Sequence, residues 1–144
     1  GRVIVQSYEP DHYAIKLAAA QDYRAFFTQE AGRRRQGLYP PFTIIARLLI
    51  EGRDKARVES AAVELEKQFQ AFLDGDARMK QQIVQMRAME APVKRLRGKA
   101  RWQVFLKLYS RGPTPQVLEK LESLARRPVE GAQVYLEIDP ATML

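Results

Sequence analysis

The order of helix and strand patterns after residue 41 is the feature that most constrains how this chain folds. Residues 37–42, GLYPPF, contain two consecutive prolines, which cannot continue a helix and favour an extended backbone. Beyond this break, four stretches have the composition or the alternation of strands, and two have the three-to-four-residue apolar spacing of helices. Their order is strand, helix, strand, strand, helix, strand.

Strands are predicted at 42–52, 82–90, 102–110 and 132–140, and helices at 53–75 and 114–127. Gly75 ends the first helix, while Thr114 is a natural N-cap and Pro115 a natural first residue of the second. The apolar stripe of the first helix consists of Val58, Ala62, Leu65, Phe69 and Phe72. This order of elements is typical of a ferredoxin-like sandwich, an α+β fold in which a four-stranded antiparallel sheet carries both helices on one face.

Residues 1–36 do not fit into that arrangement. A short β-rich stretch at 2–10 precedes a helical pattern at 11–36, whose arginines at 33–35 come late, as the helix dipole prefers. One strand and one helix bury little surface by themselves. We therefore predict a boundary near the double proline, with residues 1–41 belonging to another domain or packing against residues 42–144.

Positive charge is concentrated in one segment. The net charge is +7, with a pI near 9.9, which favours polyanionic partners. Between Arg87 and Arg111 there are eight Lys or Arg residues and one acid, Glu90, so this segment alone accounts for the net charge. Five cations lie around a predicted turn: Lys94, Arg95, Arg97, Lys99 and Arg101. Two explanations remain open: a solvated basic hairpin that keeps the protein in solution, or contact with nucleic acid.

Pro92 and Gly98 are expected to bend the backbone so that the five cations project from one end of the sheet. Residues 97–105, RGKARWQVF, partly match the third-strand signature of RNA-recognition motifs. Lys99 and Arg101 occupy the positions that should stack bases, so what remains is charge, which favours phosphate contact without sequence preference. An RNA-binding module of ribosomal-protein or RNA-recognition type is the alternative.

The strand at 102–110 has two distinct faces. Trp102 shares the parity of Val104 and Leu106 and is expected in the core, although a stacking role is the other interpretation. Phe105 and Tyr109 have the opposite parity, together with Lys107. In the predicted fold that second face carries no helix.

Several classes of chemistry are excluded. There is no cysteine, hence no disulfide and no Cys-based zinc site, which fits a cytoplasmic protein, and no apolar run is long enough to cross a bilayer. No phosphate-binding loop occurs, so we expect no cofactor in this fragment and no ATP hydrolysis.

The lone His12 near a helix start is expected to be a cap or packing residue. An acylphosphatase on this scaffold would need an asparagine, and the chain has none.

Several motifs, in order, resemble the C-terminal end of the PriA (primosomal protein N′) family of bacterial replication-restart DNA helicases. GRVIVQSYEPDHYAI (1–15) resembles the stretch after the last helicase motif, and DYRAFFTQEAGRRRQGLYPPF (22–42) resembles D-Y-x-x-F-x-x-E-x-x-x-R-x-x-x-x-Y-P-P-F. APVKRLRGKARWQVFLK (91–107) is similar to the P-x-x-R-hydrophobic-x-G-x-x-R-W motif, and EIDPATML (137–144) to the family's terminus. Ser7 replaces the usual threonine, and Ala100 replaces a common aromatic residue.

The resemblance implies the C-terminal part of an ATP-dependent 3′–5′ DNA helicase that recognises stalled forks and restarts replication through primosome assembly. It implies that residues 1–41 are the end of the second helicase lobe and a linker, and that 42–144 are a DNA-binding domain. The ATP, Mg²⁺ and zinc sites of such a protein lie upstream. The helix-free face then either docks on the helicase lobe or touches DNA.

The implied partners are branched and single-stranded DNA, single-stranded DNA-binding protein (SSB) and other primosome proteins, with no membrane. Arg111 and Gln116, near the start of the helix at 114–127, are candidates for the acidic tail of SSB, because a helix N-terminus and an arginine both favour a carboxylate. The DNA-binding candidates are Lys94, Arg95, Arg97, Lys99, Arg101 and Lys107.

Overall fold

The computed structural model describes residues 1, 3–110 and 114–140. The chain divides into two compact units, Gly1–Leu38 and Tyr39–Leu144.

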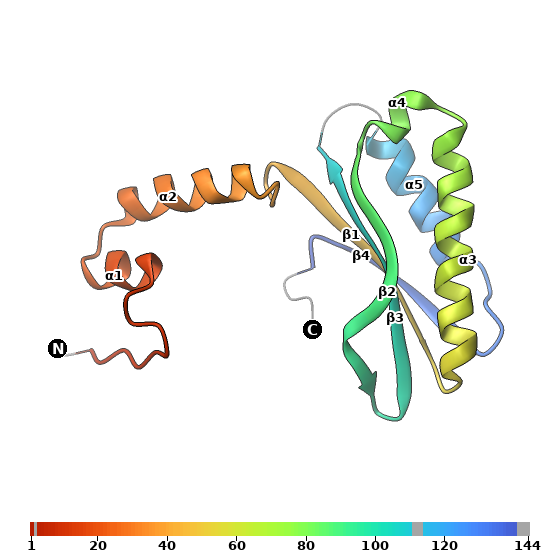
Figure 1. Ribbon diagram of the computed structural model, residues 1–144, viewed down its shortest axis with the longest axis horizontal. Helices are drawn as coiled ribbons and strands as arrows, with labels where there is room; N and C mark the ends of the chain where they lie inside the picture. Colours follow the sequence, from red (N-terminus) through yellow and green to blue (C-terminus); the bar gives the residue numbers. More distant parts are fainter. Residues whose placement is uncertain (2, 111–113, 141–144) are drawn as a thin grey trace. The chain divides into compact units, whose positions relative to one another are not determined.

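The second unit is built on one sheet. Its elements are β1 (Thr43–Gly52), α3 (Lys55–Asp74), the short α4 (Ala77–Lys80), β2 (Ile83–Leu96), β3 (Lys99–Tyr109), α5 (Thr114–Ala125) and β4 (Ala132–Ile138). The strand order is β2-β3-β1-β4, and each neighbouring pair is antiparallel. Both α3 and α5 lie on the same face of the sheet (Figure 1). The predicted α+β fold with a four-stranded antiparallel sheet is confirmed.

The core lies between the sheet and these two helices. It contains Ala46, Leu48 and Ile50 of β1, Val104, Leu106 and Leu108 of β3, Val58, Ala62, Leu65, Phe69 and Leu73 of α3, and Val117, Leu121 and Leu124 of α5. Trp102 packs against this core and is partly buried, as its parity predicted. Phe105, Lys107 and Tyr109 lie on the opposite face, which we call the helix-free face.

The hairpin of β2 and β3 differs from the prediction. Both strands run further than expected, so the predicted broad turn shrinks to Arg97 and Gly98, whose φ angles are +50° and +78°. Positive φ at both central residues is typical of tight two-residue hairpin turns. The pairing register shifts from Glu90 opposite Trp102 to Arg95 opposite Ala100. Residues 91–94, which we call the β2 bulge, therefore bulge opposite a single residue of β3.

The bulge explains how β2 tolerates a proline. Pro92 lacks a backbone N–H and would leave a gap in a regular ladder, but within a bulge the ladder is already interrupted. The sequence predicted a strand that ends at residue 90 and a backbone bent by Pro92. In the structure it only displaces the strand, and pairing resumes at Arg95.

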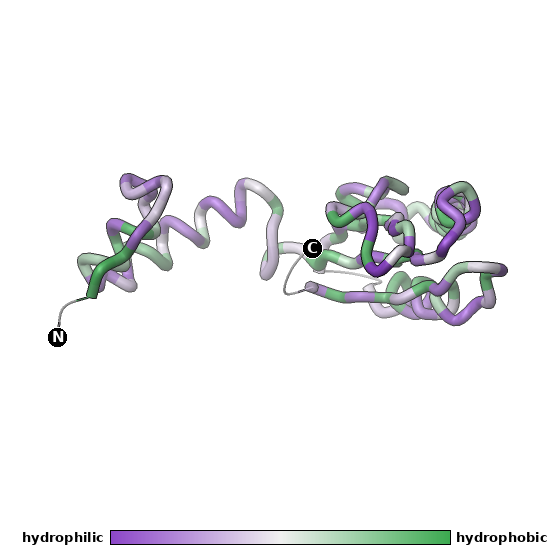
Figure 2. Tube along the Cα trace, turned by 90° about the horizontal axis from the view of Figure 1, so that it is seen from below, coloured by the Kyte–Doolittle hydropathy of each residue, from purple (hydrophilic) through white to green (hydrophobic). Residues whose placement is uncertain are grey.

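The first unit lacks the strand predicted at 2–10. Residues 3–10 form no strand, and Val3 and Ile4 are each 86% exposed. Figure 2 shows a hydrophobic stretch, in green, close to the N-terminus. A strand needs a neighbour with which to pair its backbone groups, and the described residues provide none here. The β-rich composition is therefore not sufficient to form one.

The helix predicted at 11–36 is instead two helices, α1 (Tyr13–Ala19) and α2 (Tyr23–Gln36). Between them Gln21 has a φ of +54°, and the Asp22 side chain accepts a hydrogen bond from the Ala25 N–H, which starts a second helix. His12 caps α1 through a bond from the Ala14 N–H to Nδ1 (3.3 Å), as expected for a histidine near a helix start. Arg33 lies in the last turn of α2, as predicted.

Candidate nucleic-acid interface

The hairpin end displays three exposed cations. Arg95 and Arg97 are exposed, and within the part of the chain that the structure describes neither side chain has a partner. Lys94, in the β2 bulge, is also exposed and lies 2.8 Å from Glu90, measured between Nζ and Oε2. These three residues, which we call the hairpin cations, adjoin the tight turn and face solvent. A polyanion can reach Arg95 and Arg97 without displacing other protein groups, whereas at Lys94 it competes with Glu90.

Glu90 neutralises part of this positive charge. Its second carboxylate oxygen lies 3.0 Å from Nζ of Lys55 in α3. The hydrogen bond from Lys94, and then that from Lys55, hold the pKa of Glu90 below its usual value. In turn, the hydrogen bond to Glu90 raises the pKa of Lys94. Lys94 is therefore firmly charged at neutral pH, but it shares its charge with a carboxylate.

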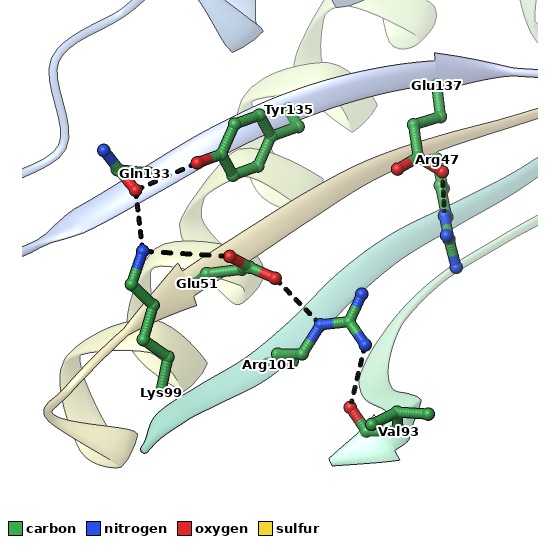
Figure 3. A network of polar contacts seen from close by, with 8 residues as sticks. All are labelled: Arg47, Glu51, Val93, Lys99, Arg101, Gln133, Tyr135 and Glu137. Atoms are coloured by element: carbon green, nitrogen blue, oxygen red, sulfur yellow. Dashed lines mark hydrogen bonds and ion pairs between the residues drawn. The ribbon is translucent and has the colours of Figure 1, made fainter. Parts of the chain in front are cut away.

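Arg101 does not project from the sheet, and that expectation is wrong. It lies on the helix-free face and is 6% exposed. Its Nε donates to Oε1 of Glu51 on β1 at 2.9 Å, and a terminal nitrogen donates to the carbonyl oxygen of Val93 at 3.4 Å (Figure 3). Because β1 places Glu51 directly opposite Arg101, the arginine is drawn inward rather than outward.

The Arg101 contacts shape the β2 bulge. Val93 belongs to the bulge, so the guanidinium links β1, β3 and the displaced part of β2. A bulge leaves backbone groups without ladder partners, and here one of those carbonyls accepts a bond from an ionised donor. Arg101 therefore holds the segment that carries Lys94, instead of offering its own charge to a ligand.

Lys99 is partly exposed at the base of the hairpin. Its Nζ donates to Oε1 of Gln133 on β4 at 2.9 Å and lies 4.0 Å from Glu51 (Figure 3). It stays accessible and lies close to the hairpin cations in sequence and in space.

The remaining predicted residues lie elsewhere. Lys107 is eight positions along β3 from Lys99, or about 26 Å at the rise of a strand, and its Nζ lies 4.2 Å from the centre of the Tyr39 ring. Gln116 is exposed in the first turn of α5. Arg111 lies outside the described residues. The predicted set is thus not one site: four residues gather at the hairpin, Arg101 supports them, and the others are separate.

An open groove next to the hairpin adds residues that the sequence did not single out. It has a volume of about 640 Å³, and its lining combines three cations, Arg53, Arg57 and Lys99, with two acids, Glu51 and Asp54, and with Gln133, Gly52, Gly131 and Ala132. The sequence around Arg53 and Gln133 does not indicate a binding site. These two residues come close to Lys99 only because β1 pairs with both β3 and β4.

The groove depends on a close approach of two backbone segments. A Cβ on Gly52 would lie 2.6 Å from the carbonyl oxygen of Gly131, so a side chain there would force β1 and the loop before β4 apart. Arg57 is bound by Glu130 at 3.1 Å. Arg53 has no side-chain partner among the described residues. The groove therefore offers Arg53 and Lys99 to a ligand, while Arg57 is largely neutralised.

The described residues offer neither a metal centre nor a membrane span. They contain no group of three or more histidines or acids that would hold a metal ion. None of the helices they form is long and apolar enough to span a bilayer.

The family model for the primosomal protein N C-terminal domain matches residues 35–141. The chain is 30% identical to the replication restart protein PriA of Bacillus subtilis over 96% of its own length and 16% of that protein. It is 28% identical to PriA of Borreliella burgdorferi, covering 95% of the chain and 19% of the relative, and 25% identical to PriA of Thermotoga maritima, covering 99% and 17%. The chain thus spans less than a fifth of the length of these relatives. It belongs to the family of PriA (primosomal protein N) C-terminal domains.

Proposed function

We propose that this chain binds DNA phosphates through the β2–β3 hairpin, as the C-terminal part of a replication restart helicase. The observation that carries the proposal is the group of exposed hairpin cations, Lys94, Arg95 and Arg97, at a tight turn. Phosphate contacts dominate the affinity of proteins for nucleic acids and do not depend on sequence. The names of the relatives, replication restart proteins, favour DNA as the polyanion.

Two further contacts extend this interface. Lys99 lies at the base of the hairpin and reaches the groove that also contains Arg53. Lys107 is a separate, weaker candidate on the helix-free face, because its ammonium group already lies over the Tyr39 ring. Arg101 holds the bulge in place and does not touch DNA.

The role of the rest of the protein is part of the same proposal and rests on the family resemblance. The whole protein would unwind DNA in the 3′–5′ direction with ATP and Mg²⁺, would hold zinc in another domain, and would recognise stalled forks in the cytoplasm together with other primosome proteins. Residues 1–41 would contribute the end of its second helicase lobe.

A contact with the acidic tail of SSB belongs to the same proposal. Gln116 is exposed in the first turn of α5, where amide donors and the helix dipole favour a carboxylate. Arg111, outside the described residues, would supply a bidentate partner. Arg111→Ala and Gln116→Ala should each weaken binding of the SSB tail peptide in calorimetry. Unchanged affinity in both variants would remove this contact.

DNA binding is tested with the chain itself and four ligands of equal length: forked DNA, duplex DNA, single-stranded DNA and duplex RNA. Affinities are measured by fluorescence anisotropy across a salt series. The logarithm of the association constant should fall linearly with the logarithm of the salt concentration, by about 0.9 per phosphate contact on duplex DNA. We expect the fork to bind most tightly. Tighter binding of RNA than of DNA would favour the RNA-binding alternative, and the absence of salt-dependent binding would overturn the proposal.

A further inference from the structure

Beside the hairpin, two donors converge on one amide oxygen. The Tyr135 hydroxyl donates to Oε1 of Gln133 at 2.9 Å, and Nζ of Lys99 donates to the same atom at 2.9 Å (Figure 3). An ammonium group can only donate, so the atom that faces Lys99 must be the amide oxygen. The Gln133 NH₂ group is therefore directed elsewhere, and among the described residues it has no partner.

This arrangement fixes an aromatic ring at the surface. Tyr135 is 43% exposed on the helix-free face, and its hydroxyl is tied to a side chain that is itself held by Lys99. A ring held in this way loses little conformational freedom when a second flat group stacks on it. The exposed ring of Tyr135 and the amide of Gln133, both on β4, and the ammonium group of Lys99 on β3 therefore lie next to one another.

The same residues border the open groove. Lys99 and Gln133 line it together with Arg53, and the groove is open to solvent, so an extended strand can enter it from the surface. Glu51 and Asp54 also line the groove, but Glu51 is paired with Arg101 and Asp54 lies 3.7 Å from Arg57. Arg53 and Lys99 beside an exposed aromatic ring therefore combine the two features that proteins use to bind single-stranded nucleic acids: positive charge for the backbone and a flat surface for the base.

We propose that Lys99, Gln133 and Tyr135 form a binding site for one unpaired nucleotide of a DNA strand that runs on from the hairpin. The base stacks on the Tyr135 ring, and the Gln133 amide donates to an acceptor on its edge. The adjoining phosphate lies in the groove near Lys99 and Arg53. The site rests on the proposed DNA-binding function and adds to it a preference for unpaired over paired DNA.

The test separates bases from phosphates. The chain is titrated with a twelve-nucleotide oligo-dT and with an abasic oligonucleotide of the same length, which has the phosphates but no bases. Tyr135→Ala should weaken binding of oligo-dT by at least about fivefold, the lower end of the cost of losing one base-stacking aromatic. It should leave binding of the abasic strand unchanged. Tyr135→Phe, which keeps the ring, should retain most of the oligo-dT affinity.

Tyr109→Ala is the matched control. Tyr109 is 40% exposed on the same face of the sheet, but it ends β3, whereas Lys99 begins that strand. It should change neither affinity. The inference fails if Tyr135→Ala binds oligo-dT as tightly as the parent, if it loses the same affinity for both strands, or if oligo-U RNA binds more tightly than oligo-dT. If Tyr135→Ala has no effect but replacing the hairpin cations weakens binding, only this inference falls. If neither change weakens binding, the proposed function falls as well.

Discussion

Arg101 and Glu51 form an ion pair inside the protein, with 2.9 Å between Nε and Oε1 and side-chain exposures of 7% and 15%. The guanidinium also donates to the carbonyl oxygen of Val93 in the β2 bulge (Figure 3). One residue of the basic segment is therefore part of the frame on which its neighbours are displayed.

Arg101→Ala should destabilise the fold by about 3 kcal/mol, because it leaves the Glu51 carboxylate poorly solvated and without its main partner. Urea unfolding followed by circular dichroism measures this loss. Arg95→Ala is the control, since Arg95 is exposed and has no partner among the described residues, and it should stay within about 0.5 kcal/mol of the parent. Equal stability of the two variants would show that the ion pair does not support the fold.

The double variant Glu51→Leu/Arg101→Leu separates stability from positioning. Replacing both partners of a buried pair with apolar side chains is often neutral for stability, so the double variant should unfold close to the parent. It lacks the bond to Val93, however, so the bulge should loosen and binding of forked DNA should weaken. A double variant that is stable and binds DNA like the parent would contradict the positioning role of Arg101.

The sequence predicted the sheet and its two helices because their signals are local. The apolar stripe of α3 and the alternation around Val104 and Leu106 are visible within one element. Burial confirms the alternation and four of the five stripe residues; at the end of α3 it is Leu73 that is fully buried, and Phe72 is only partly buried. In the strand predicted at 132–140, alternation gives Ile138 the inward parity of Val134 and Leu136, but Ile138 ends β4 and is 42% exposed. The strand expected at 2–10 is absent because a strand forms only beside another strand, and composition does not reveal whether such a neighbour exists.

The candidate site was predicted only in part. Alternation places Arg101 on the helix-free face, but its burial depends on Glu51, fifty residues earlier in the chain, which only the β1–β3 register brings opposite. Gln133 and Arg53 meet Lys99 for the same reason. Charge density in the sequence therefore located the hairpin, but it did not distinguish cations that face solvent from one that is used in the structure.

Glu90→Gln should strengthen DNA binding at neutral pH. It removes the one acid in the basic segment and frees Lys94, so the slope of log affinity against log salt should steepen by up to about 0.9 on duplex DNA. Glu122→Gln is the control, because Glu122 on α5 forms an exposed pair with Arg126, which directly follows that helix. An unchanged affinity in Glu90→Gln would show that Lys94 does not contact phosphate.

The same glutamate gives a pH dependence. Because hydrogen bonds from Lys94 and Lys55 lower the pKa of Glu90 in the folded protein, its contribution to stability is present above the pKa of the unfolded state. That contribution is lost as the pH falls through the lower folded pKa. The parent should therefore be more stable than Glu90→Gln at neutral pH, and the two should converge in acid. A stability difference that persists below the folded pKa would contradict this assignment.

The first unit should open more readily than the second. Neither α1 nor α2 contains a buried residue, whereas Leu106 in β3 is fully buried. Amide hydrogen exchange follows the free energy of local opening, which is small where few apolar contacts hold an element. The amides of residues 3–5 and of both helices should exchange far faster than that of Leu106. Equal protection in the two units would show that the first has packing of its own.

The most direct test of the account is the salt dependence of fork binding after removal of the hairpin cations. Lys94, Arg95 and Arg97 are replaced with alanine, and the control replaces Lys67, Arg126 and Arg127, three cations on or just after the helices, so that both variants lose the same charge. We predict that the hairpin variant keeps the parent's fold and binds forked DNA more weakly. Its slope of log affinity against log salt should be shallower by about 0.9 for each phosphate that it no longer binds. The control should keep the parent's slope. Equal slopes in the hairpin variant and the parent would contradict the account and leave the hairpin as a solvated basic surface.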